Sequence, residues 1–165
     1  MDTQALSTAY ANLHKVAQTV GVHEAPPAGE WNADQILAHI VLINAATISA
    51  ACSVTSGAVA TYDNRLAQDA WTIDRTIALA GGSEGLRRRI QLQAEALIAV
   101  VSTLSETELS TPIPAILVSN DSLLLDDRAP LEGLIDGLAT SELPGHATQL
   151  SELRGIQGRR RSSVS

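Results

Sequence analysis

Phenylalanine is absent from this sequence of 165 residues, and aromatic residues make up only 2% of it. The hydrophobic core must therefore be built from Ala, Leu, Ile and Val. Ala and Leu are strong helix formers, whereas strands favour aromatic and β-branched residues, so this composition favours helices. Apolar residues still make up 45% of the chain, which excludes wholesale disorder and is enough for the core of one domain.

Positive charge is also scarce, because 11 Lys and Arg residues against 18 Asp and Glu residues give a formal net charge of −7. A surface this acidic repels phosphate backbones, so we expect no nucleic-acid partner. Cys52 is the only cysteine, which rules out an internal disulfide and is consistent with a reducing compartment. The sequence has neither a run of about 18 uncharged apolar residues nor a basic-then-apolar N-terminal signal. We therefore expect a cytoplasmic protein without a membrane partner.

Apolar residues recur at alternating spacings of three and four in several stretches, which is the pattern of an amphipathic helix. Asn32 is a good N-cap residue for the second stretch, Ser83 can cap a later one, and Pro130 is well placed as the first residue of the last. The pattern predicts four long helices, over residues 3–20, 32–54, 83–104 and 130–153, and a shorter one within 63–80.

The connections have their own signals. Two prolines and a glycine predict a loop over residues 23–30. Two short apolar runs, at 116–118 and 123–125, flank Asn120-Asp121 and indicate either a small hairpin or an ordered loop. Residues 155–165 have no apolar periodicity, so we expect a disordered basic tail. The fold class predicted for residues 1–154 is all-α: a four-helix bundle with one extra short helix and a long loop before the last helix.

Two predicted apolar stripes are interrupted by polar residues. His39 lies between Ile36 and Ile43 on one stripe, and Glu142 and His146 lie four residues apart on the stripe of the last helix. A buried carboxylate without a partner is costly, so it must meet a cation, a proton or water. Two imidazoles and one carboxylate are ligands that zinc takes, and three protein ligands leave a fourth position open, as in catalytic sites. The alternatives are a hydrogen-bonded core histidine and an exposed i,i+4 pair.

Two stretches carry a family resemblance. WNADQILAHI, residues 31–40, resembles the start of the second helix in the DinB-like four-helix-bundle superfamily, where a Trp is followed eight residues later by a metal-binding His. ELPGHATQLSELR, residues 142–154, resembles the last helix of the same families. In the branch of the mycothiol-dependent maleylpyruvate isomerase N-terminal domain, the ligands are one His, then Glu and His four apart. The matching residues here are His39, Glu142 and His146.

This resemblance implies a bundle that holds a divalent metal, zinc or nickel, at those three residues. It also implies thiol-dependent chemistry, in which the metal binds a low-molecular-weight thiol such as mycothiol and the thiolate attacks a small electrophilic substrate. The sequence departs from a regular last helix at Pro144, followed by Gly145. A proline inside a helix removes a hydrogen bond and costs about 3 kcal/mol, so we expect a kink that could separate Glu142 from His146.

The leading hypothesis is therefore a metal-binding, thiol-dependent transferase or isomerase. One alternative, which Pro144 favours, is a non-catalytic helical bundle that binds or sequesters a small apolar ligand. The other is a dimerisation module, forming a homodimer through an exposed apolar helix face. Of the remaining residues, we expect Cys52 and Trp71 to pack in the core, and Trp31 to anchor the start of its helix at the mouth of any pocket.

Overall fold

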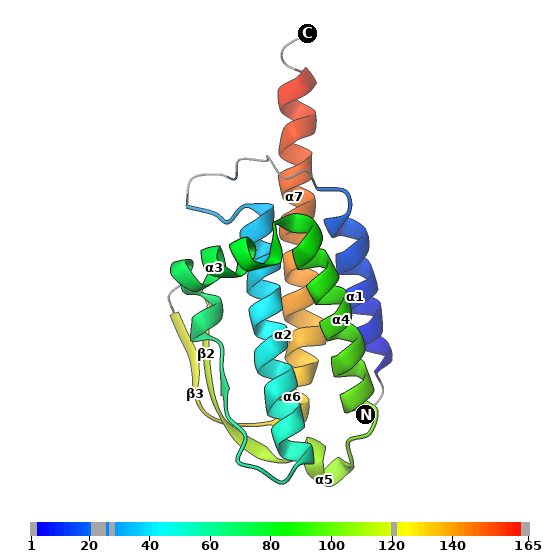
Figure 1. Ribbon diagram of the computed structural model, residues 1–165, viewed down its shortest axis with the longest axis vertical. Helices are drawn as coiled ribbons and strands as arrows, with labels where there is room; N and C mark the ends of the chain where they lie inside the picture. The colour runs from blue at the N-terminus through cyan, green and yellow to red at the C-terminus, as the bar shows by residue number, and fades with distance from the viewer. Residues whose placement is uncertain (1–2, 21–25, 27–28, 120–121, 163–165) are drawn as a thin grey trace.

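The computed structural model describes residues 3–20, 26, 29–119 and 122–162, with side chains as far as Leu153. Most of this part of the chain is helical, and a small sheet lies against one side of the helices (Figure 1). In chain order the elements are α1 (Gln4–Ala17), α2 (Ala33–Thr55), β1 (Tyr62–Asp63), the 3-10 helix η1 (Arg65–Ala67), α3 (Ala70–Ala80), α4 (Ser83–Val101), α5 (Glu106–Leu109), β2 (Pro112–Ser119), β3 (Ser122–Pro130), α6 (Leu131–Gly137), the π-helical turn η2 (Leu138–Glu142) and α7 (Leu143–Ser162).

Four helical rods form the predicted bundle: α1, α2, α4 and the continuous helix made by α6, η2 and α7 (Figure 1). Their predicted apolar stripes make the core, whose hydrophobic side chains are aliphatic apart from two buried tyrosines, Tyr10 and Tyr62; a few polar residues such as His39 and Asn44 are buried with them. The predicted start of α2 is confirmed, because the side chain of Asn32 accepts from the backbone N–H of Gln35 and the side chain of Gln35 accepts in return from the backbone of Asn32. This reciprocal capping fixes where the helix that carries His39 begins.

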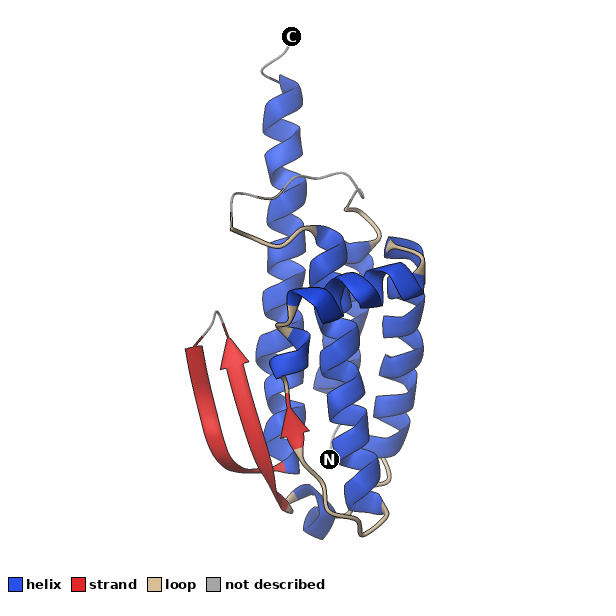
Figure 2. Cartoon of the chain, turned by 60° about the vertical axis from the view of Figure 1, so that its left-hand side comes forward, coloured by secondary structure: helices blue, strands red, loops and turns tan. Residues whose placement is uncertain are grey.

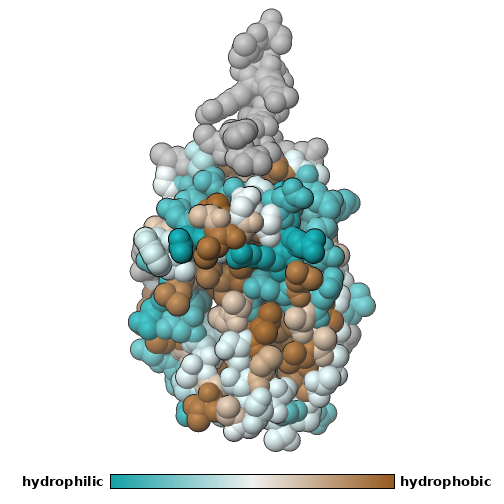
Figure 3. Space-filling view, viewed as in Figure 1, coloured by the Kyte–Doolittle hydropathy of each residue, from teal (hydrophilic) through white to brown (hydrophobic). Residues whose placement is uncertain are grey.

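One helix among the described residues, α2, is long and apolar enough to cross a membrane by length and composition. The expectation that the chain has no such run was therefore wrong. More than half of its most apolar window is buried inside the bundle, as in the core helix of a packed domain. On the face drawn in Figure 3, exposed apolar side chains are interspersed with hydrophilic ones.

The connection before the last helix is a hairpin, so the fold is not purely all-α. Strands β2 and β3 pair antiparallel, from Pro112 opposite Pro130 to Ser119 opposite Ser122, with an irregularity after Leu117. The short strand β1, which the sequence analysis did not predict, pairs parallel with β2 and completes a three-stranded sheet beside the bundle (Figure 2). Residues 112–115 alternate between exposed prolines and buried Ile113 and Ala115, which is the burial pattern of a strand with one face on a core.

The helix predicted within 63–80 is wrong in its first third. That stretch forms the end of β1 and the 3-10 turn η1, and α3 begins only after Asp69, whose carboxylate accepts from the backbone N–H of Thr72 at 2.8 Å. Gly81 ends α3 in the left-handed region, with φ of 78°. Gly82, not Ser83, occupies the N-cap of α4, and the Ser83 hydroxyl instead donates to the Asp34 carboxylate on α2.

Two residues expected in the core lie at the surface. The side chain of Trp71 is 73% exposed, because Ile73 and Thr76 form the buried face of α3. Cys52 is also exposed, because Ala50, Ala51 and Val54 mark the buried face of this part of α2 and Cys52 is rotated away from it. The prediction of a disordered tail from residue 155 is contradicted as far as Ser162, where α7 ends. The loop predicted over 23–30 lies largely outside the described residues.

The last helix accommodates Pro144 because a π-helical turn precedes it. The backbone N–H of Leu143 bonds five residues back to the carbonyl of Leu138, and Pro144 follows as the second residue of α7. The turn inserts one residue into the helical repeat, which rotates the later residues by about 100°. The buried positions therefore shift from the register of Leu131 and Ile135 to that of Leu143 and Ala147.

Candidate metal centre

The π-helical turn decides where the two polar residues of the last helix lie. In a uniform α-helix, Glu142 and His146 would continue the buried stripe of α6, as the sequence analysis predicted. After the turn, the core positions pass to Leu143 and Ala147, which are fully or nearly fully buried. The side chains of Glu142 and His146 keep 42% and 12% exposure and lie at the flank of the helix, facing α2.

His39 meets them from the buried side. Its side chain is 2% exposed on α2, and its ring lies 5.0 Å from the Trp31 ring and 4.7 Å from the His146 ring, centroid to centroid. The Nδ1 atom of His39 lies 2.8 Å from the carbonyl oxygen of Ala67 in η1. A carbonyl only accepts, so Nδ1 carries the hydrogen and donates it. In the neutral ring, Nε2 therefore carries no hydrogen, and its lone pair faces Glu142 and His146.

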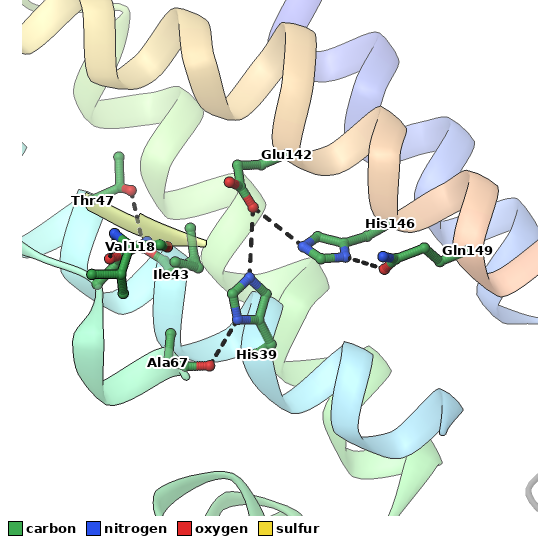
Figure 4. A network of polar contacts seen from close by, with 9 residues as sticks. His39, Ile43, Thr47, Ala67, Val118, Glu142, His146 and Gln149 are labelled. Atoms are coloured by element: carbon green, nitrogen blue, oxygen red, sulfur yellow. Dashed lines mark hydrogen bonds and ion pairs between the residues drawn. The ribbon is translucent and has the colours of Figure 1, made fainter. Parts of the chain in front are cut away.

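Glu142 stands between the two rings, as Figure 4 shows. Its Oε2 atom lies 3.2 Å from His146 Nε2 and 3.5 Å from His39 Nε2. The kink expected at Pro144 therefore does not separate Glu142 from His146. The Nδ1 atom of His146 lies 2.8 Å from the side-chain oxygen of Gln149, which fixes the second ring in the same way. One donor atom from each of the three residues lies within 4.8 Å of the others.

Electrostatics keep this carboxylate charged. The contact with His146, and then that with His39, hold the pKa of Glu142 well below its ordinary value, although burial acts in the opposite direction. The Nε2 atom of His39 is buried and makes no hydrogen bond. A buried nitrogen with a lone pair needs a proton or a cation to offset its desolvation.

The residues present fit a divalent metal. With ligand bonds of about 2.0–2.2 Å, tetrahedral zinc places its donor atoms about 3.3–3.6 Å apart. The two separations to Glu142 Oε2, 3.2 and 3.5 Å, are close to this range. The backbone carbonyl and the amide oxygen that hold the Nδ1 atoms are the partners that metal-ligating histidines ordinarily have. Metal binding itself stays a prediction.

A cleft of about 430 Å³ opens from these three residues. Its remaining walls come from residues 29–31 and the start of α2, from Gln68 at the end of η1, from the end of β2 and from α7, so segments far apart in the sequence meet there. The lining residues are Gly29, Glu30, Trp31, Ile36, His39, Gln68, Ser119, Glu142, His146, Gln149, Glu152 and Leu153.

The sequence analysis missed a residue that holds one wall of this site. Asn64 is buried, and its side chain donates to the carbonyl of Val118 at 3.0 Å and accepts from the N–H of Val118 at 2.8 Å. These two bonds attach η1 to strand β2, three residues before the carbonyl of Ala67 that orients His39. A single asparagine in a loop gives no sequence signal of this role, because its partner is backbone 54 residues away.

Comparison with known proteins gives a fold and no family. No protein-family model matches the chain, and no curated protein matches it. Among solved structures, the chain is similar to the crystal structure of a mycothiol-dependent maleylpyruvate isomerase, with a TM-score of 0.67 and 13% sequence identity. The match covers 88% of this chain but 57% of the isomerase chain, so the protein described here spans little more than half of that length. The two share a related fold.

Proposed function

We propose that this protein holds a divalent metal, zinc or nickel, at His39, Glu142 and His146, and presents it to a low-molecular-weight thiol such as mycothiol for a transfer or isomerisation reaction. The observation that supports the proposal most is the buried, unpartnered Nε2 atom of His39, which faces the charged carboxylate of Glu142 at the inner end of a cleft. The fold shared with a mycothiol-dependent isomerase agrees with it.

Each residue has a separate task in this proposal. His39 and His146 offer Nε2 lone pairs, because Ala67 and Gln149 accept the hydrogens of the Nδ1 atoms. Glu142 adds one negative charge, and its lowered pKa keeps it ionised at neutral pH. A divalent metal bound there supplies Lewis acidity, which lowers the pKa of a bound thiol or water. Trp31 packs against His39 and covers it on the side of the α2 start.

The thiol must come from solution. Cys52 is the only cysteine of the chain. It lies on the same helix as His39 and thirteen residues later, which places it about 20 Å along the helix axis. A thiol at that distance cannot reach the three donors, so the protein has no internal nucleophilic sulfur at this site.

The two alternative functions have less support. A small apolar ligand would be sequestered in an apolar cavity, but this cleft is lined by glutamate, glutamine and serine side chains. Homodimer formation stays a prediction that light scattering tests. The cytoplasmic location remains part of the proposal, since a reducing compartment keeps both Cys52 and a small thiol reduced.

Metal analysis tests the proposal directly. Protein purified without chelator should contain about one divalent metal per chain, or take up one Co²⁺ on titration, as Co²⁺ accepts the same ligands as zinc. The His39→Ala variant should lose it, whereas Glu132→Gln, a change at an exposed glutamate on α6, should keep it. Addition of 2-mercaptoethanol to the Co²⁺ form should produce a sulfur-to-cobalt absorption band. A wild-type chain that takes up no metal, or a band that fails to appear, contradicts the proposal.

A further inference from the structure

The charged side chains that line the cleft around the three donors are all acidic, apart from the two histidines. Besides Glu142, the exposed carboxylates of Glu30 and Glu152 line it, and no Lys or Arg is found among its described lining residues. Its other polar groups are the amides of Gln68 and Gln149 and the hydroxyl of Ser119. The buried Nε2 atom of His39 points into the same cleft without a hydrogen-bond partner, which marks the cleft as a ligand site and not merely an acidic surface.

A charge balance shows what such a cleft accepts, given the proposed function. Two neutral imidazoles add no charge, and the carboxylate of Glu142 with one thiolate sulfur neutralises a divalent metal. The negative charges of Glu30 and Glu152 then remain, and no described cation in the cleft balances them. Any further group on the ligand lies in their field, and a cleft with low-dielectric walls strengthens that field.

We infer that the ligand of this cleft carries no carboxylate or phosphate: the part of the thiol or acceptor beyond its reacting atoms is uncharged or cationic. The amides, the serine hydroxyl and the Trp31 ring supply hydrogen bonds and a flat contact surface for such a molecule. The inference rests on the proposed thiol chemistry and separates the substrate of this protein from dicarboxylic acids such as maleylpyruvate.

Three small thiols of similar size test it, because they share the sulfur and differ in the charge of the tail. Cysteamine is cationic, 2-mercaptoethanol is neutral and 3-mercaptopropionate is anionic. Each is titrated into the Co²⁺ form of the full chain, and the sulfur-to-cobalt band gives its dissociation constant. The same series is run on the double variant Glu30→Gln/Glu152→Gln and on the control Glu95→Gln/Glu132→Gln, which removes two exposed carboxylates outside the cleft.

The measured quantity is the preference for 2-mercaptoethanol over 3-mercaptopropionate in each protein, so intrinsic differences between the thiols cancel. We expect this preference to fall about fivefold in the cleft variant, because two like charges near the tail are removed. The affinity for cysteamine relative to 2-mercaptoethanol should decrease in the cleft variant, because two charges that attract its ammonium group are removed. The control variant should show the same preferences as the wild type.

Equal preferences in the wild type and the cleft variant, with thiols still bound, would overturn this inference and leave the proposed function intact. A Co²⁺ form that binds none of the three thiols would overturn both. A chain that binds no Co²⁺ would overturn the metal site itself, so the three failures are distinguishable.

Discussion

The donor atoms of the candidate site depend on neighbours that are not donors. His39 is oriented by a backbone carbonyl and His146 by the side-chain oxygen of Gln149, 2.8 Å away in each case. Partners of this kind fix the ring and its tautomer, so that the free nitrogen of each ring already faces the other donor atoms. If the proposed metal site is right, we expect their removal to weaken metal binding although all three candidate ligands remain.

The Gln149→Leu variant should therefore bind metal more weakly than the wild type, by about tenfold, the lower end of the range measured for such partners. Competition with a chromophoric chelator measures the affinity. Gln91→Leu, at an exposed position of α4 remote from the cleft, is the matched control and should bind normally. Equal affinities in the two variants would show that Gln149 does not orient His146.

Glu142→Gln keeps the size of the side chain and removes its charge. Its Oε2 atom lies 3.2 and 3.5 Å from the two Nε2 atoms and would be the anionic ligand, so the amide should lower the affinity for a divalent metal by about 100-fold or more. The same titration measures this loss, with circular dichroism to verify the fold. A variant that binds metal as the wild type does would exclude Glu142 as a ligand.

At this scale the sequence predicted the three donor residues but not the backbone group that orients His39. His39, Glu142 and His146 were identified because they interrupt apolar stripes, and they lie together in the structure. The carbonyl of Ala67 could not be predicted, since every residue has one and only the fold selects it. Cys52 and Trp71 were placed wrongly because residue type alone does not determine which side of a helix faces the core.

Among the elements, η1 and the hairpin act together as a support for α2. Asn64 joins them through its two bonds to Val118, and η1 then presents the carbonyl of Ala67 to His39. The sheet, which lies beside the bundle in Figure 2, is thus connected to His39 through Asn64 and η1.

The Asn64→Ala variant should lose both stability and metal affinity. Two buried hydrogen bonds are removed, which costs about 1–3 kcal/mol in the free energy of unfolding. Ser105→Ala removes the cap of α5 at a cost of about 1 kcal/mol and lies outside the cleft lining, so it separates the two effects. Urea unfolding of the metal-free proteins and chelator competition measure them. A metal affinity that falls equally in both variants would show a general effect of stability.

Three elements, β2, β1 and the π-helical turn, could not be predicted clearly from the sequence. Pro112 and Pro114 obscured the alternation of β2, because prolines are depleted in strands and tolerated here at exposed positions. The two residues of β1 form a strand only because β2 lies alongside, and β propensity depends on such partners. Pro144 indicated a distortion of the last helix but not its form, which depends on the backbone bonds that Leu138 and Leu143 make.

For the whole molecule, both tyrosines of the chain are buried, and this makes stability sensitive to alkaline pH. Burial raises the pKa of Tyr62 to about 12 and raises that of Tyr10 further. Unfolded tyrosine ionises near pH 10. The fold therefore favours the neutral phenol, and this contribution is complete below pH 10 and is lost as pH rises from 10 towards 12.

The free energy of unfolding should decrease by about 2 kcal/mol over that interval for each tyrosine. Denaturant unfolding at a series of pH values measures it, and absorbance at alkaline pH follows phenolate formation. In the Tyr62→Phe variant the decrease should be smaller. Ionisation of both tyrosines near pH 10 in the folded protein would contradict this prediction.

The wide turn at residues 138–142 has a further consequence for comparing this chain with others. Because of this turn, the last helix contains one residue more than a regular α-helix would need to join the same core positions. An alignment with a bundle whose last helix is regular therefore requires a gap of one position there. Without that gap, an alignment that begins in α6 would match Glu142 and His146 with buried positions of the regular helix.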